Sequence, residues 1–309
     1  MMRKQIGKQF GVELLFAVVL CAGAQPKAEA VTLYFGLTIG NTINGVNYDV
    51  NDIVKYNTVS NTASVFFDGD TIFNPQVNKV KIDAFDILSN GDFLISTDRN
   101  ASIGALSFQN EDLVRIDHTT HAASLFFDGS AVFKASVDLE AIDVLPSGHL
   151  VFAAGKGEIA KNSLKFQSRD LIEYDPVTGD ASIFFKGADN FTGKKGTLTG
   201  VDVLDDGRLV LIVGDAGREA NIGGLKVGRR DIFIYDPVKK TAVELLNGDD
   251  IFQRTSHGHD QGFSLVDVEQ TPPPPPPAIP EPMSASLFGL GLGVAGFRGA
   301  RRRRSGSIV

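Results

Sequence analysis

The sequence predicts an all-β fold made of four similar repeats. The segment Asp52–Tyr56 recurs as Asp112–Ile116, Asp170–Tyr174 and Asp231–Tyr235, at spacings of 60, 58 and 61 residues. The apolar runs between turn residues are short and rich in β-branched and aromatic side chains, as in strands, and the repeats carry no helical periodicity. Four short strands per unit at a fixed period are typical of β-propeller blades.

Each repeat supplies its strands in the same order. The inner strands are expected at Phe85–Leu88, Ile142–Leu145, Val201–Leu204 and Phe263–Glu269. A turn glycine (Gly91, Gly148 or Gly207) leads into a second strand such as Phe93–Ser96 or Leu209–Val213. The Asp52-type segment is the third strand, and the outer strand lies within Ser64–Gly69, Ser124–Gly129, Ser182–Gly187 or Val243–Gly248. Asp175–Gly179 is expected to be a tight turn between the third strand and the outer strand of its repeat, because proline presets φ.

The two ends of the repeat array complement one another. The blades that begin at Phe85, Ile142 and Val201 are complete, which leaves the inner strand Phe263–Glu269 at the C-terminal end. The N-terminal end leaves Leu33–Ile39, Asp52–Tyr56 and Ser64–Phe67. Together these segments make one blade, so we expect a four-bladed β-propeller whose closing blade is shared between N- and C-terminal strands. Closure would remove exposed sheet edges. A curved open array or a β-sandwich is the alternative.

The N-terminal residues 1–30 have the pattern of a signal peptide. Arg3, Lys4 and Lys8 precede the apolar run Leu14–Ala24, and Ala28-Glu29-Ala30 is a small-x-small site for signal peptidase, with Ala22-Gly23-Ala24 as a second one. The chain has a single cysteine, Cys21, which lies inside this peptide. The exported protein would therefore contain no disulfide bond.

The C-terminal residues carry a second export feature. Prolines at 272–277 form a stiff extended spacer. Pro280-Glu281-Pro282 follows, then an apolar segment that ends at Phe297, then Arg298 and a cluster consisting of Arg301, Arg302, Arg303 and Arg304. The segment Met283–Phe297 is shorter than the roughly 20 residues of a spanning helix. We expect a short hydrophobic helix here that anchors the chain only transiently.

In this order the C-terminal elements resemble the PEP-CTERM sorting signal of bacterial surface proteins. The resemblance implies export, brief anchoring in the inner membrane, processing by an exosortase near the Pro-Glu-Pro, and transfer to the cell surface or the extracellular polysaccharide matrix. The expected organisation is a signal peptide at 1–30, a propeller at 31–270, a Pro-rich linker at 271–282 and a sorting signal at 280–304.

The repeat region is strongly acidic. Residues 31–270 hold 21 of the 30 basic and 34 of the 37 acidic residues, a net charge of −13. Such a surface repels nucleic acid, so no nucleic-acid partner is expected.

Two groups of residues are candidates for a divalent cation such as Ca²⁺. Asp86, Asp143, Asp202 and Asp267 recur in the inner strands, where they could surround a cation or accept hydrogen bonds from the next blade. His257, His259 and Asp260 form the one cluster outside the repeat and could ligate a transition metal. Because the acids follow the repeat, a structural role is favoured for them and for Asp52, Asp112, Asp170 and Asp231.

Other features point to the rim that carries the loops between second and third strands. These loops are long, at 40–51, 98–111, 155–169 and 214–230, and they either bind a ligand or form hairpins that cover the rim. Asp83 and Glu140 lie at the same distance before the predicted start of their inner strands. Thr199 and Ser264 occupy the equivalent positions in the other two repeats, so these four residues can make an asymmetric pocket. Asp68–Asp70 and Asn247–Asp250 resemble calcium loops without completing the EF-hand spacing.

The sequence favours a non-enzymatic role, as a binding or structural protein of the cell surface or its matrix. It contains no Gly-x-Ser-x-Gly elbow, phosphate-binding loop or His-Glu-x-x-His motif. It also contains no tryptophan for sugar stacking, although Phe and Tyr can substitute. Two alternatives stay open. One is a secreted propeller hydrolase or lactonase with a divalent cation on the loop rim, and the other is a calcium-stabilised scaffold without catalysis.

Overall fold

The computed structural model describes residues 31–73, 80–193, 196–214, 220–229, 231–252 and 263–269. The chain divides into two units, Met1–Gln270 and Thr271–Val309, and all described residues belong to the first. The expected signal peptide, Pro-rich linker and sorting signal lie outside the described residues. None of the helices within the described ranges has the length and apolar character needed to cross a membrane.

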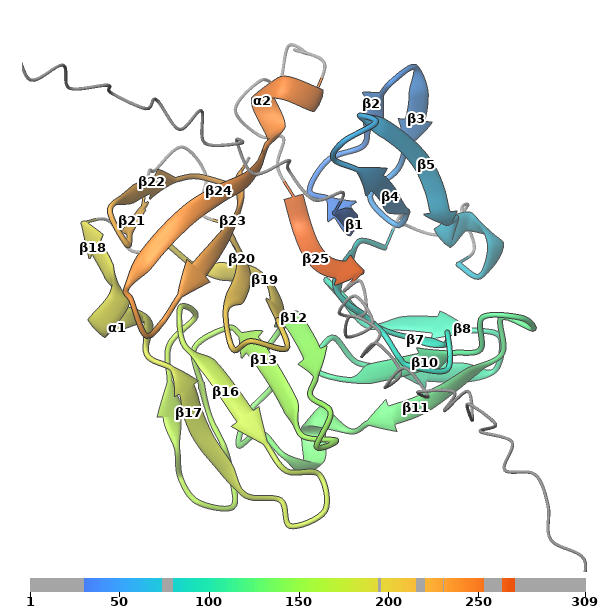
Figure 1. Cartoon of the computed structure of the whole chain (residues 1–309). Coiled ribbons are helices and arrows are strands. Elements are labelled where there is room, and N and C mark those ends of the chain that lie inside the picture. Colours follow the sequence, from blue (N-terminus) through green and yellow to red (C-terminus); the bar gives the residue numbers. More distant parts are fainter. Residues whose placement is uncertain are drawn as a thin grey trace, which may run out of the picture. The chain divides into compact units, whose positions relative to one another are not determined.

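The fold is all-β, antiparallel and propeller-like, with four four-stranded sheets (Figure 1). Sheet 1 consists of β25 (Phe263–Glu269), β1 (Thr32–Leu37), β4 (Ile53–Asn57) and β5 (Thr62–Phe67), and sheet 2 of β6 (Ile82–Ile87), β7 (Phe93–Thr97), β10 (Leu113–Ile116) and β11 (Ala123–Phe127). Sheet 3 consists of β12 (Leu139–Val144), β13 (Leu150–Ala154), β16 (Leu171–Tyr174) and β17 (Ala181–Phe185), and sheet 4 of β19 (Leu198–Val203), β20 (Leu209–Val213), β23 (Asp231–Asp236) and β24 (Thr241–Asn247). The strands of each sheet are given in order from the inner strand to the outer strand.

Sheet 1 joins the two ends of the repeat array. Antiparallel pairing between β1 and β25 runs from Thr32 opposite Glu269 to Leu37 opposite Phe263, and Figure 1 shows the two strands side by side. The predicted pairing of the last strand with the first is therefore correct. The rings of Phe35 and Phe263 meet edge to face, with centroids 4.8 Å apart, so packing as well as backbone pairing holds this junction.

Four hydrophobic cores lie between consecutive sheets. Sheets 1 and 2 share one core, sheets 2 and 3 the next, sheets 3 and 4 the third, and the fourth joins sheet 4 back to sheet 1. The second strands show why their sequences are continuously apolar. In β20, Val210 and Ile212 enter one core while Leu209, Leu211 and Val213 enter another, because successive side chains of a strand point to opposite faces.

The observed inner strands begin three residues earlier than predicted. They start at Ile82, Leu139 and Leu198 instead of Phe85, Ile142 and Val201. A β-bulge interrupts each strand near its start, so the period-two pattern begins only beyond the bulge. The turn glycines are confirmed, since Gly91, Gly148 and Gly207 all have φ between +82° and +87°.

Single-turn helices follow the outer strands, which the sequence did not predict because one turn is too short to show periodicity. They are η1 (Gly69–Thr71), η2 (Gly129–Ala131), α1 (Gly187–Asn190) and α2 (Gly248–Ile251). The first residue must be glycine for lack of space. A Cβ at Gly129 would lie 2.1 Å from the carbonyl oxygen of Glu111, and the same clash occurs at Gly69 and Gly187.

The recurrence of an aspartate at the start of each third-strand segment has a structural cause. Asp112 accepts the N–H groups of Gly129 at 2.9 Å and Gln109 at 2.8 Å, so it ties the outer-strand glycine to the turn before the third strand. Asp52 and Asp170 make the same pair of bonds. The favoured structural role of this set is confirmed for these three residues.

We predict that β25 is required for stability. A chain that ends at residue 262 would leave β1 as an open edge and remove the buried Phe263, whose loss alone costs about 3–5 kcal/mol. Thermal and denaturant unfolding followed by circular dichroism should show a much lower midpoint than for a chain that ends at residue 270. Equal midpoints for the two chains would show that the β1–β25 pairing contributes nothing.

Candidate functional site

Hairpins occupy the rim that carries the N-terminal ends of the inner strands. They are β2 (Asn41–Ile43) with β3 (Val46–Tyr48), β8 (Ala101–Ile103) with β9 (Leu106–Phe108), β14 (Gly157–Glu158) with β15 (Lys165–Phe166), and β21 (Ala220–Ile222) with β22 (Leu225–Val227), the last extended by β18 (Phe191–Gly193). Each hairpin buries apolar side chains, for example Ile103 and Phe108. The long loops are therefore hairpins that cover the rim, as one of the two interpretations expected.

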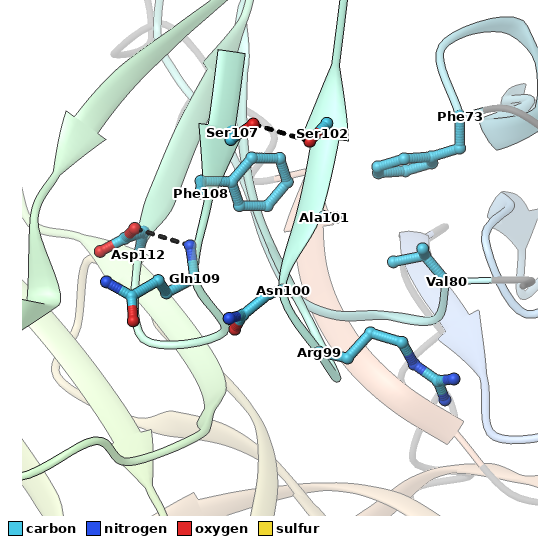
Figure 2. Close-up of a pocket in the computed structure, with 10 residues that line it drawn as sticks. All are labelled: Phe73, Val80, Arg99, Asn100, Ala101, Ser102, Ser107, Phe108, Gln109 and Asp112. Atoms are coloured by element: carbon cyan, nitrogen blue, oxygen red, sulfur yellow. Dashed lines mark hydrogen bonds between the residues drawn. The ribbon is translucent and has the colours of Figure 1, made fainter. Parts of the chain in front are cut away.

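One of these hairpins forms the wall of an open cavity of about 590 Å³. The cavity lies between β8–β9 and the connection from β5 to β6, which supplies Phe73 and Val80 (Figure 2). Figure 2 shows the rings of Phe73 and Phe108 pointing toward one another, with Asn100 and Gln109 at another part of the lining. Both rings are almost fully buried and form the apolar floor. We call this cavity the hairpin pocket.

The polar residues that line the hairpin pocket are exposed, apart from the buried Asp112, and most of them are uncharged. Arg99 donates from Nε to Asp98 Oδ1 at 3.0 Å, and hydrogen bonding to Asp98 raises the pKa of Arg99. The hydroxyl groups of Ser102 and Ser107 are 2.9 Å apart. The side-chain amide of Gln109 makes no hydrogen bond to any residue that the structure describes, while its backbone N–H donates to Asp112. A ligand therefore meets amide and hydroxyl groups above an aromatic floor.

The inner-strand acids form a closed cycle of hydrogen bonds. Asp86 accepts the N–H of Val144 at 2.9 Å, and Asp143 accepts that of Val203 at 3.1 Å. Asp202 accepts the N–H of Val268 at 3.0 Å, and Asp267 accepts that of Ile87 at 2.9 Å, which returns the cycle to the strand where it began. Each carboxylate thus binds the backbone of the next inner strand, as the structural interpretation expected. We call these four residues the axial aspartates.

Burial changes the acidity of the axial aspartates. Desolvation, opposed by the backbone N–H donors, raises the pKa of Asp143 to about 6. Desolvation also raises the pKa of Asp86 and Asp202 well above the usual value, and the charge of Asp267 adds to both shifts. These carboxylates therefore hold protons more strongly in the folded chain than in the unfolded one.

The histidines do not form a metal site in the described part of the chain. His118 and His149 lie in turns at the other rim, as predicted, and each pairs with an acid: His118 Nδ1 lies 3.0 Å from Asp92 and His149 Nδ1 lies 2.8 Å from Glu173. His257, His259 and Asp260 lie outside the described residues. Across those residues, no three His, Cys, Asp or Glu side chains are grouped so that they could hold a metal ion.

The two segments that resemble calcium loops are helix caps. The side chain of Asp68 accepts the N–H of Asp70 at 3.0 Å, and that of Asn247 accepts the N–H of Asp249 at 2.9 Å. Both therefore begin a single-turn helix, in which a side-chain oxygen satisfies an N–H group that has no partner within the helix.

Sequence reasoning did not find the hairpin pocket. It singled out the loop 98–111 as a whole, but Arg99, Asn100 and Gln109 are ordinary polar loop residues without a motif. Phe73 and Val80 come from a different sheet connection, so only the packing of sheet 1 against sheet 2 brings them to the hairpin.

No family model matches the chain, and no curated protein matches it. Among solved structures, it is similar to a protein of unknown function from Bacteroides caccae, with 9% identity and a TM-score of 0.33 over 78% of this chain and 100% of the other. The extracellular domain of a one-component system from B. thetaiotaomicron matches at 11% identity and a TM-score of 0.26, over 73% of this chain and 26% of the other.

A catalytically inactive virginiamycin B lyase from Staphylococcus aureus, solved with quinupristin, matches at 10% identity and a TM-score of 0.28 over 79% of this chain and 71% of the other. At such identities and TM-scores these similarities carry no inference about the function of this chain.

We predict that the axial aspartates make the fold less stable as the pH rises from about 4 to about 6. An unfolded aspartate ionises near pH 3.9, whereas folded Asp143 ionises at about 6, so over this interval the unfolded chain loses a proton that the folded chain keeps. For Asp143 the stability lost by pH 7 is roughly 2–3 kcal/mol, and Asp86 and Asp202 act in the same direction.

Urea unfolding between pH 4 and 7 measures this effect. Asp143→Asn keeps an acceptor for the N–H of Val203 and should reduce the fall in stability. Asp128→Asn, at an exposed turn, is the control and should leave the fall as in the wild type. An unchanged fall in Asp143→Asn would contradict the assignment.

Proposed function

We propose that this chain is an exported, four-bladed β-propeller that binds a neutral saccharide in the hairpin pocket. The observation that carries the proposal is the composition of that pocket, an aromatic floor surrounded by exposed amide and hydroxyl groups. In this proposal the four sheets are the blades. Three features support the blade count: each sheet has four strands, the four cores join consecutive sheets in a cycle, and β25 pairs with β1.

The chemistry of the hairpin pocket suits sugar hydroxyl groups. A hydroxyl both donates and accepts, and so do the amides of Asn100 and Gln109 and the hydroxyl groups of Ser102 and Ser107. The small exposed parts of Phe73 and Phe108 can contact the apolar C–H groups of a pyranose. The volume of about 590 Å³ lies within the usual range for small-ligand sites.

Charge favours a neutral sugar over an acidic one. Residues 31–270 have a net charge of −13, which repels polyanions. Among the described lining residues, Arg99 is the one that carries a cationic group, and its guanidinium is already paired with Asp98. A uronic acid would therefore find no unpaired cation among the described lining residues.

The proposed location follows from the two chain ends. Under this proposal, signal peptidase removes residues 1–30 and an exosortase-type enzyme acts near Pro280-Glu281-Pro282, so that the propeller reaches the cell surface or the polysaccharide matrix after transient anchoring in the inner membrane. Saccharide binding in the hairpin pocket would then hold the protein in that matrix. Catalysis is not part of the proposal, because the axial aspartates bind backbone N–H groups and His257, His259 and Asp260 lie outside the described residues.

The binding proposal predicts a difference between two equivalent glutamines. Gln109 and Gln167 occupy the same position in their hairpins, since each backbone N–H donates to the third-strand aspartate, but only Gln109 lines the hairpin pocket. Gln109→Ala should weaken binding of neutral oligosaccharides about tenfold, the effect of losing one hydrogen bond. Gln167→Ala should bind as the wild type does.

Titration calorimetry of the exported protein with a panel of neutral oligosaccharides measures both variants. Equal loss in the two variants would show that binding occurs elsewhere. No binding across the panel would overturn the saccharide proposal.

The sorting proposal predicts the C-terminus of the exported protein. In the native host, intact mass measurement should find a chain that has lost Arg301–Arg304. In a host without exosortase, the uncleaved chain should accumulate in the membrane fraction, and deletion from Pro280 onward should release the protein directly. An exported protein that still carried the arginine cluster would overturn the processing step.

A further inference from the structure

Every inner strand has a β-bulge at the same position near its N-terminal end. The pairing with the second strand shifts between Ile82 and Ala84 in β6, between Leu139 and Ala141 in β12, and between Leu198 and Gly200 in β19. The residues at the bulges are Asp83, Glu140 and Thr199, and β25 has its irregularity at the corresponding place. A bulge redirects a side chain, and bulges are common beside functional sites. We call Asp83, Glu140 and Thr199 the bulge residues.

The side-chain oxygen atoms of the bulge residues have no hydrogen-bond partners within the described part of the chain. Asp83 is completely buried, yet neither carboxylate oxygen accepts a hydrogen bond. The hydroxyl oxygen of Thr199 is likewise buried without a partner. Glu140 is half-buried and also makes no described hydrogen bond or ion pair. Unsatisfied buried polar groups are rare in folded proteins and often mark a missing ion or water.

The inner strands that carry the bulge residues contact one another. β12 contacts both β6 and β19, and β6 also contacts β19. The bulge residues occupy equivalent backbone positions in these three strands. Burial raises the pKa of Asp83, and the charges of Asp138, Glu140 and Asp98 add to that shift.

Charge is poorly balanced around Asp83. Lys81 is the nearest cation, but its Nζ lies 3.9 Å from Asp83 Oδ2, beyond hydrogen-bond distance. Asp98 is bound by Arg99, and Asp138 accepts a hydrogen bond from the amide of Asn110 at 3.0 Å. Asp83 and Glu140 therefore share one ammonium group and have no other described donor. An ionised carboxylate in a buried site is costly without a partner.

We propose that the bulge residues form a binding site for a hydrated divalent cation of the Ca²⁺ or Mg²⁺ type. Two carboxylates and one hydroxyl are hard oxygen ligands, and water completes the coordination, as is usual where a protein supplies only one or two carboxylates. The site is separate from the axial aspartates, whose oxygens bind backbone N–H groups, and from the hairpin pocket.

The acidity of the bulge residues is consistent with this assignment. Burial raises the pKa of Asp83 well above its usual value, and Lys81 only partly opposes the shift. Burial also raises the pKa of Glu140, again against Lys81. A bound cation would compete with protons for these carboxylates, and Lys81 would move aside from it.

Thermal unfolding of the full exported chain tests the proposal without any saccharide. After treatment with chelator, addition of Ca²⁺ or Mg²⁺ to 100 times its Kd should raise Tm by about 5–10 °C. Asp83→Asn removes a buried carboxylate that accepts no hydrogen bond and has only Lys81 as a charge partner, so it should raise Tm in the absence of the cation and abolish the cation response. Lys81→Gln removes the competing ammonium and should lower the cation concentration needed for half of the response.

Asp206→Asn is the control, because this acid is exposed in the turn at the other rim and pairs with Arg208. It should respond to the cation as the wild type does. The proposal is overturned if Ca²⁺, Mg²⁺ and Mn²⁺ all leave Tm of the wild type unchanged, or if Asp83→Asn keeps the full response. Saccharide titration is measured separately, so failure of one site leaves the other test intact.

Discussion

Four hydrogen bonds, each donated by a backbone N–H group and accepted by an aspartate side chain, connect the inner strands of this protein in a closed cycle. The bond from Asp202 to Val268 and the bond from Asp267 to Ile87 involve the last strand of the repeat region, so closure depends on residues separated by most of the chain. The remaining architecture follows from this constraint. Once the inner strands are fixed, the second strands are buried on both faces and the four cores form between consecutive sheets.

The same constraint has an electrostatic cost. The cycle places acidic side chains close together in a desolvated region, which raises the pKa of Asp86, Asp143 and Asp202. Hydrogen bonds from the backbone offset part of that cost, because an N–H group stabilises the ionised carboxylate. The buried acids thus lower the stability of the fold above pH 4, while their hydrogen bonds fix the arrangement of the inner strands. Removal of a single acceptor would leave a buried N–H group unsatisfied, which costs about 1–3 kcal/mol.

Departures from the repeat occur at the two places where we propose that a ligand binds. The axial aspartates are present in every repeat and have equivalent partners, as a structural element should. The bulge residues occupy equivalent backbone positions but differ in chemistry, with Asp83, Glu140 and Thr199 in successive strands. The hairpin pocket is likewise local, since Gln109 lines it while the equivalent Gln167 binds the carbonyl of Phe166. Repetition therefore supplies the scaffold, and local substitutions provide the two sites that we propose.

The observed strand ends show where sequence reasoning is limited. The turn glycines and the outer turn at Asp175–Gly179 were predicted correctly, because φ requirements and proline act locally; Gly179 has φ of +73° and Asp175 accepts the N–H of Val177. The inner strands were predicted to start too late, because the bulges break the alternation and place Asp83 and Glu140 where a strand would show an apolar residue. The single-turn helices were missed, since one turn has no period.

The sequence by itself determined the all-β class, the strand order within each repeat and the complementarity of the two ends, because these follow from local periodicity and from a repeat that is visible in the residues. It also indicated that the axial aspartates are structural, since they recur with the repeat. Only the tertiary structure decided which residues line the hairpin pocket and which buried oxygens lack partners. Phe73 lies in the connection from β5 to β6, whereas Gln109 follows β9. The absence of a hydrogen-bond partner for Asp83 depends on every side chain packed around it, which no local pattern can encode.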